Sequence, residues 1–122
     1  MIVADTSLLV EHLRGSKVAT AFLARQPMVI VPAYAAWELW KGAHEPRERD
    51  KVSALLAVAG VEPFSAGHAE RAGALYRDAQ RQGRKPPVMD LLIASHALHR
   101  SCALATLDRD YSGIPGLPVV KP

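Results

Sequence analysis

Residues 1–15 read MIVADTSLLVEHLRG, and Asp5 is the residue in this stretch that most needs an explanation. Residues 2–4 are typical of a buried strand, and the residues that follow Asp5 are typical of a helix. A carboxylate at such a junction either caps the helix or holds a positive charge. Thr6 or Ser7 could cap this helix equally well, so the stretch alone leaves both interpretations of Asp5 open.

Short apolar runs alternate with helical patterns along the rest of the chain. The pattern predicts strands at 1–5, 28–31 and 102–106, helices at 7–15, 17–26, 33–45, 49–60, 66–83 and 88–100, a loop at 107–116, and edge strands at 61–64 and 117–120. Such alternation indicates an α/β fold with a short, mainly parallel central sheet flanked by helices. Ligands of such sheets bind beyond the carboxyl ends of the strands, where Asp5 and Asp108 are expected to lie.

Length and composition narrow the class of protein. The 122 residues, 49% of them hydrophobic, are enough for one compact domain spanning 1–122. No apolar run approaches the roughly 18 residues of a membrane span, and no secretory signal is recognisable, so a cytoplasmic protein is expected. Cys102 is the single cysteine, which excludes a disulfide framework. The net charge of +3 is compatible with a polyanionic partner.

Four acidic residues lie near expected strand ends or helix starts: Asp5, Glu38, Asp90 and Asp108. Each has an ordinary structural explanation when taken alone. Asp5 and Asp90 could cap helices, Glu38 could pair with Lys41 on a solvated face, and Asp108 could make a turn.

The four acids are more informative as a set, because like charges brought close together repel unless a cation neutralises them. Carboxylate oxygens favour hard divalent ions such as Mg²⁺ or Mn²⁺. An ion of this kind can activate water for an in-line attack on a phosphate group.

Four stretches carry a family resemblance: IVADTSLLVEHL (2–13), VPAYAAWELWKGA (31–43), VMDLLIASHAL (88–98) and LATLDRDY (104–111). In this order and spacing they resemble the PIN-domain ribonucleases, above all the toxin subunits of VapBC toxin–antitoxin pairs. The resemblance implies a PIN-like three-layer fold and an Mg²⁺- or Mn²⁺-dependent endoribonuclease. It also implies an RNA substrate, a cognate antitoxin, a homodimer and no membrane.

The same resemblance assigns roles to individual residues. Asp5, Glu38, Asp90 and Asp108 would be the catalytic, metal-binding quartet. Thr6, Ser7 and Thr106 would match small hydroxyl positions that order the site, with Asp110 as an accessory acid.

The sequence departs from the family pattern in three places. The last motif often ends in Phe, where this chain has Tyr111. Asp110 is acidic as well as Asp108, so either could supply the fourth acid. The basic RKPP segment (84–87) lies outside the pattern; Arg84 and Lys85, with Arg81, could contact RNA phosphates or simply form a solvated helix end.

Other residues suggest alternative sites. His96 and His99 lie three residues apart, but no third ligand at a matching position is evident, so surface or partly buried histidines are expected rather than a zinc site. Trp37 and Trp40 are expected in the core or at a dimer interface, with stacking on RNA bases as the alternative.

Two other classes of function are alternatives to a nuclease. A phosphoryl-acceptor domain would need a second aspartate two residues after Asp5, where Ser7 stands. A PIN-like module that binds RNA or protein without cutting remains the alternative, although four intact acids count against it.

Overall fold

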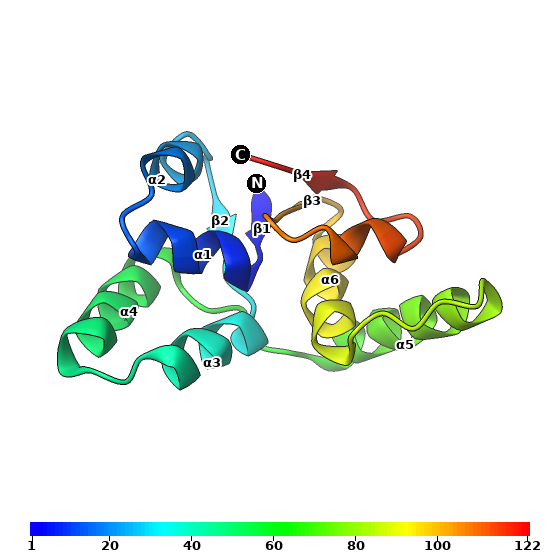
Figure 1. Cartoon of the computed structure of the whole chain (residues 1–122). Helices are drawn as coiled ribbons and strands as arrows, with labels where there is room; N and C mark the ends of the chain where they lie inside the picture. The colour runs from blue at the N-terminus through cyan, green and yellow to red at the C-terminus, as the bar shows by residue number, and fades with distance from the viewer.

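The computed structural model describes the backbone of residues 1–122 and all side chains except those of Asp110 and Ser112. In chain order its elements are β1 (Ile2–Ala4), α1 (Thr6–Leu13), α2 (Lys17–Ala24), β2 (Val29–Ile30), α3 (Ala33–Gly42), α4 (Pro46–Ala59), α5 (Ala66–Arg81), α6 (Val88–Arg100), β3 (Ala103–Ala105), the 3₁₀ helix η1 (Asp110–Gly113) and β4 (Val119–Val120). Figure 1 shows these elements from the blue N-terminus to the red C-terminus.

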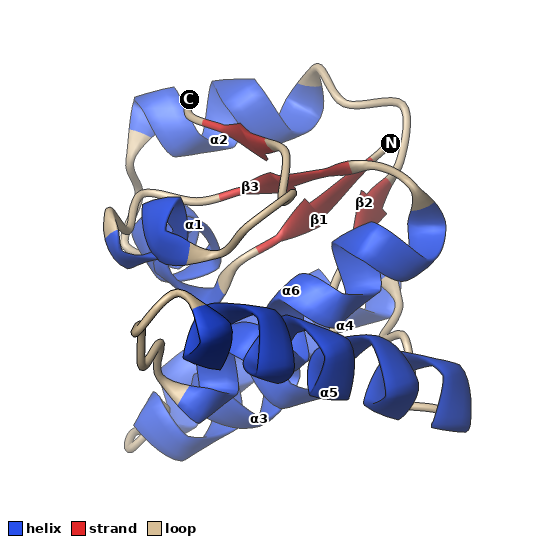
Figure 2. Cartoon of the chain, turned by 90° about the vertical axis from the view of Figure 1, so that its right-hand side faces the viewer, coloured by secondary structure: helices blue, strands red, loops and turns tan.

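The central sheet is parallel throughout, with strand order β2-β1-β3-β4. In its register Ile2 pairs with Val29, and Ala4 pairs with Ala105. The sheet lies between α2 on one side and α5 and α6 on the other (Figures 1 and 2). The prediction of an α/β fold with a short parallel sheet flanked by helices is therefore confirmed.

Buried residues explain why β1 and β3 form the centre of this sheet. Val3, Ala4, Leu104 and Ala105 have no exposed surface. They belong to a core cluster to which α1, α3 and α6 also contribute. Central parallel strands are covered on both faces, which is why these two strands consist of consecutive apolar residues.

Local signals set most of the helix boundaries. Ser65 caps α5: its hydroxyl accepts from the His68 backbone, and the His68 ring accepts from the Ser65 backbone N–H. The predicted start of the fourth helix at residue 49 was late, because Pro46 begins α4 with a pre-set φ angle.

Two further predictions were wrong in detail. The expected edge strand at 61–64 is reduced to an isolated bridge between Glu62 and Pro32. The expected loop at 107–116 contains η1. Among the described residues, no helix combines the length and apolarity needed to cross a membrane.

Candidate active site

Asp5 lies where β1 meets α1, and the structure decides between its two possible roles. It occupies the N-cap position of α1 but makes no side-chain capping hydrogen bond. Its carboxylate instead accepts hydrogen bonds from Ser7 Oγ at 2.9 Å, Thr106 Oγ1 at 2.7 Å and Tyr111 Oη at 2.8 Å. Only 5% of Asp5 is exposed. The side chain is thus held for a purpose other than capping the helix.

The parallel register brings the two ends of this site together. Because Ala4 pairs with Ala105, Asp5 and Thr106 are the next residues beyond neighbouring strands. The backbone N–H of Asp5 donates to Ala105 O at 2.9 Å. Thr106 Oγ1 accepts from the Asp108 backbone N–H at 2.9 Å, and this bond fixes the start of the turn that carries Asp108.

Glu38 reaches the same region from α3. Thr6 Oγ1 donates to Glu38 Oε1 at 2.8 Å, which ties the first turn of α1 to the middle of α3. Lys41, the expected partner in the alternative interpretation, places its ammonium 4.7 Å from the centre of the Trp37 ring. The structure therefore connects Glu38 to the Asp5 segment.

Asp90 and Asp108 approach the site from α6 and from the turn after β3. Asp90 lies in the first turn of α6, and both aspartates are partly buried. Both aspartates lie close enough to Tyr111 to affect its hydroxyl group. The pKa of Tyr111 is raised first by burial and then by the charges of Asp5, Asp90 and Asp108. Three acids of the predicted quartet therefore act on one buried hydroxyl group.

The donor set fits a hard divalent cation. Every predicted ligand is a carboxylate, and the groups that bond to Asp5 and Glu38 are uncharged hydroxyls that orient the negative charge without cancelling it. Oxygen ligands of this type suit Mg²⁺ or Mn²⁺ better than softer metals.

The accessory and basic residues are placed as follows. Thr6, Ser7 and Thr106 all bond to predicted acids, whereas Asp110 lies outside the described side chains. Arg81 forms an ion pair with Asp78 on α5, and Lys85 is exposed.

Arg84 takes a different position from the other basic residues of its segment. Its Nη1 lies 3.7 Å from where a Cβ on Gly113 would be. Gly113 ends η1, the helix that carries Tyr111. The Arg84 guanidinium therefore lies beside η1.

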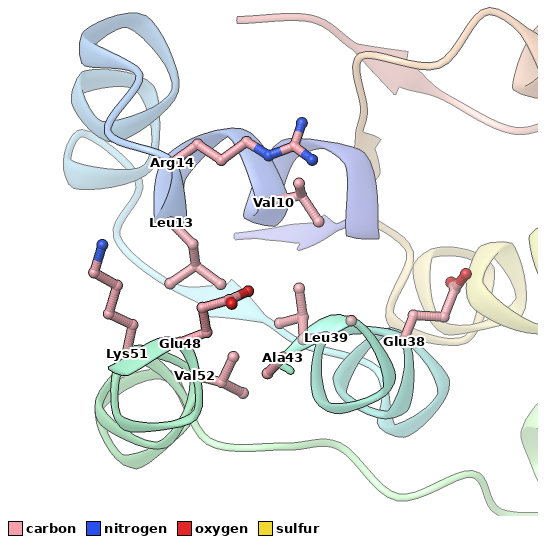
Figure 3. Close-up of a pocket in the computed structure, with 10 residues that line it drawn as sticks. Val10, Leu13, Arg14, Glu38, Leu39, Ala43, Glu48, Lys51 and Val52 are labelled. Carbon is pink, nitrogen blue, oxygen red and sulfur yellow. The ribbon is translucent and has the colours of Figure 1, made fainter. Parts of the chain in front are cut away.

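A cavity of about 310 Å³ opens beside Glu38, between α1, α3 and α4. Figure 3 shows apolar side chains from all three helices facing it and charged side chains around its edge. The apolar lining includes Val10, Leu13, Leu39 and Val52; the charged residues are Arg14, Glu38, Glu48 and Lys51. This cavity, called the α1–α3–α4 groove below, therefore has an apolar floor and contains one acid of the predicted quartet, Glu38, in its lining.

A second titratable cluster was missed by sequence reasoning. Glu62, His68 and His96 bring one ligand atom each to within 4.8 Å of one another. The expectation of surface or partly buried histidines was wrong for His96, which is fully buried beside Glu62 and His68, whereas His99 is exposed. Only the spacing to Ser65 gave a signal for His68, as part of a capping box.

Hydrogen bonds link the members of this cluster. The Ser65 backbone N–H donates to His68 Nδ1 at 2.9 Å, so Nε2 carries the proton that bonds Glu62 Oε1 at 2.7 Å. His96 Nδ1 lies 3.0 Å from the same oxygen, and Arg100 Nε donates to Oε2 at 2.9 Å. Both oxygens of Glu62 are thus bonded within the protein, and the cluster joins α5 and α6 to the segment that carries Glu62.

Tyr111 is the other residue whose role the sequence did not reveal. It stood out only as a departure from the family pattern, yet it is 1% exposed and bonds directly to Asp5. A buried tyrosine hydroxyl needs a hydrogen-bond partner, and this requirement could have indicated a nearby acceptor.

Comparison with known proteins agrees with this geometry. Residues 2–117 match the model of the PIN domain. The chain is 33% identical to Ribonuclease VapC10 of Mycobacterium tuberculosis over 110 residues, which cover 88% of this chain and 83% of that one. Its fold is similar to VapBC-1 from nontypeable Haemophilus influenzae, with a TM-score of 0.86, 21% identity and coverage of 99% and 98% of the two chains. It is also similar to VapBC2 from Rickettsia felis bound to a promoter DNA fragment, with a TM-score of 0.85, 21% identity and coverage of 100% and 99%. This chain belongs to the PIN-domain family.

Proposed function

We infer that this protein is an endoribonuclease, the toxin of a VapBC-type toxin–antitoxin pair, that hydrolyses RNA phosphodiesters with the help of a divalent metal ion. The observation that carries this conclusion is the state of Asp5. It is a buried carboxylate at the end of a central strand, it does not cap its helix, and hydroxyl groups hold both of its oxygens.

Asp5, Glu38, Asp90 and Asp108 are the residues proposed to hold Mg²⁺ or Mn²⁺. When bound, such an ion lowers the pKa of a water molecule and stabilises the charge that develops on the phosphate. Hydrolysis by water would leave 5′-phosphate and 3′-hydroxyl ends.

The hydroxyl residues have the supporting role in this proposal. Ser7 and Thr106 hold Asp5 from one side, and Thr6 holds Glu38. Because each hydroxyl is also anchored by the backbone or by its helix, the acids keep their orientation before substrate arrives. Asp110 keeps its proposed accessory role.

Arg84 is proposed as an RNA contact, with Lys85 and Arg81 contributing less. Its position beside η1 places a guanidinium near the acidic site, where it could pair with a substrate phosphate. Arg81 is already paired with Asp78, which reduces its availability.

The proposed antitoxin site is the α1–α3–α4 groove shown in Figure 3. Its apolar floor suits a hydrophobic segment, and Glu38 at its edge could receive a basic side chain of that segment. The similar solved structures from Rickettsia felis and Haemophilus influenzae are of VapBC proteins, which supports a protein partner of this class.

Domain organisation, oligomeric state and location complete the proposal. We propose one domain over residues 1–122, since a single core cluster draws on residues from β1 to η1. Trp37 and Trp40 are 50% and 43% exposed on α3, and we propose this face for a homodimer. We also propose a cytoplasmic location, where an RNA substrate is available.

The test is cleavage of a mixed structured RNA by protein purified without antitoxin. Cutting is expected with Mg²⁺ or Mn²⁺ and not with EDTA. Asp5→Asn keeps the size of the side chain and is expected to lower the rate at least about 100-fold, since even groups that only support a metal ligand contribute 10- to 100-fold.

Two results would contradict this function. Cutting that persists in EDTA and in Asp5→Asn would indicate a contaminant or a mechanism without metal. Metal binding without cutting of any RNA would favour a PIN-like module that binds RNA or protein without cleavage.

A further inference from the structure

We propose that Tyr111 is a positioning residue that orients Asp5 so that the carboxylate binds the metal through Oδ1 alone. The inference rests on the metal-dependent function proposed above. It is carried by the hydrogen bonds around Asp5, which occupy the two carboxylate oxygens unequally.

Oδ2 of Asp5 is the more heavily used oxygen. It accepts from Ser7 Oγ at 2.9 Å and from Thr106 Oγ1 at 2.7 Å. A carboxylate oxygen offers about two lone-pair sites, so these two bonds saturate Oδ2.

The direction of these two bonds follows from the carboxylate, which can only accept. Ser7 Oγ accepts from the Leu107 N–H at 3.1 Å, and Thr106 Oγ1 accepts from the Asp108 N–H at 2.9 Å. The two hydroxyl oxygens also lie 3.2 Å apart, but each has a single proton, and in the bonds to Oδ2 that proton points to Asp5. The 106–108 turn therefore keeps Oδ2 occupied.

Among the side chains that the structure describes, Oδ1 receives one hydrogen bond, from Tyr111 Oη at 2.8 Å. One lone pair of Oδ1 then remains for a cation. Tyr111 is the donor in this bond because its partner is a carboxylate, which can only accept. The phenol thus selects which lone pair of Asp5 stays open.

The position of Tyr111 suits this task. Its side chain is 1% exposed, so the ring is fixed by the core. The Ile114 N–H donates to Tyr111 O at 3.1 Å and closes the turn of η1 around it. A rigid ring with a single polar atom places that atom accurately, which a flexible side chain would not do.

The experiment compares Tyr111→Phe with Tyr34→Phe, both measured without RNA. Phe keeps the ring of Tyr111 and removes only the hydroxyl. Tyr34, on α3, makes an edge-on contact with Phe64 and serves as the matched control. The dissociation constant for Mn²⁺ is read from the electron paramagnetic resonance signal of the free ion, and folding is checked by circular dichroism.

Tyr111→Phe is expected to weaken Mn²⁺ binding about tenfold, in the range typical for groups that support a metal ligand. Cleavage at saturating Mn²⁺ should recover most of the wild-type rate, and Tyr34→Phe should bind as the wild type does. A merely structural tyrosine would lower stability without this split between metal affinity and maximal rate.

A crystal of the wild-type protein with Mn²⁺ gives a test that needs no variant. The anomalous peak is expected beside Asp5 Oδ1 and away from Oδ2. A peak at Oδ2, or a Tyr111→Phe dissociation constant within twofold of wild type, would overturn the inference. If the wild type still cleaves RNA only with metal, the proposed function stands without it; if the wild type shows no metal-dependent cleavage, both fail.

Discussion

Two clusters of titratable residues in this fold each surround a carboxylate, but with partners of different charge. In the acidic site, Asp5 is surrounded by the hydroxyl groups of Ser7, Thr106 and Tyr111. In the histidine cluster, defined as Glu62, His68, His96 and Arg100, the carboxylate of Glu62 meets two imidazoles and a guanidinium. Both carboxylates are well hydrogen-bonded, but only that of Glu62 receives a formal positive charge from its neighbours.

The difference separates a site built for a ligand from one built for stability. Burial alone would raise the pKa of Glu62, but bonds from His96, His68 and Arg100 bring it below its usual value. The charge of Glu62 is thus balanced within the protein. Hydroxyl groups orient Asp5 but supply no charge, so the bonds that hold this carboxylate leave its negative charge in place.

Replacing each carboxylate by its amide, in Glu62→Gln and Asp5→Asn, tests this contrast. These two substitutions are expected to have the largest effects on stability and on cleavage. Glu62→Gln should destabilise the fold by roughly 3 kcal/mol, because it breaks a mostly buried charged network. Its cleavage rate at a temperature where it is folded should match the wild type. Asp5→Asn should show the reverse: cleavage lost and the free energy of unfolding little changed or raised.

Urea denaturation and RNA cleavage on the same preparations measure both properties. If Glu62→Gln lost cleavage while folded, the histidine cluster would have to be assigned to the active site. A large destabilisation by Asp5→Asn would show that the hydroxyl shell around Asp5 is mainly structural.

Removing one hydroxyl from the acidic site should give an intermediate effect. Thr106→Val keeps the shape of a fully buried side chain but removes a donor to Asp5 and an acceptor for the Asp108 N–H. We expect a loss of about 2 kcal/mol in stability and about tenfold in Mn²⁺ affinity. Calorimetric titration with Mn²⁺ checks the second value.

Thr20→Val is the matched control. Thr20 is exposed, and its hydroxyl bonds to His12 Nδ1 and not to an acid of the site. Equal effects of the two substitutions would mean that loss of a threonine hydroxyl, and not its contact with Asp5, accounts for the change.

The smallest expected effect concerns pH and the histidine cluster. Burial lowers the pKa of His96 below 6.5, despite its bond to Glu62. Between the lowered folded value and 6.5 the unfolded chain binds more protons, so stability rises with pH and is lost as the pH falls below about 6.5. The lowered pKa of Glu62 adds a further loss of stability as the pH falls below its ordinary value of 4.5.

His96→Asn removes the titrating group and keeps an N–H donor. The slope of unfolding free energy against pH between 5 and 7 should become shallower, by up to one proton. His44→Asn, an exposed histidine, should leave the slope unchanged. An unchanged slope in His96→Asn would contradict the assignment of the pH dependence to His96.

Much of the fold was predictable because the deciding signals are local. The apolar run before Asp5, the capping serine at 65 and the apolar helix at 88–100 each predicted the element that the structure has. The wrong predictions concern segments whose structure depends on contacts with residues far away in the sequence. Residues 61–64 were predicted as a strand, but Glu62 pairs with Pro32 as a single bridge and its side chain serves the histidine cluster.

The sequence by itself determined the parallel α/β fold, its order of elements and the identity of the acids, because periodicity and residue type act over short distances. Tertiary structure decided what those acids do. Only the register of β1 with β3 places Thr106 beside Asp5, and only η1 brings Tyr111 to Oδ1, 106 residues away in the chain. Hydrogen bonds depend on distances of a few ångströms, and sequence separation carries no information about them.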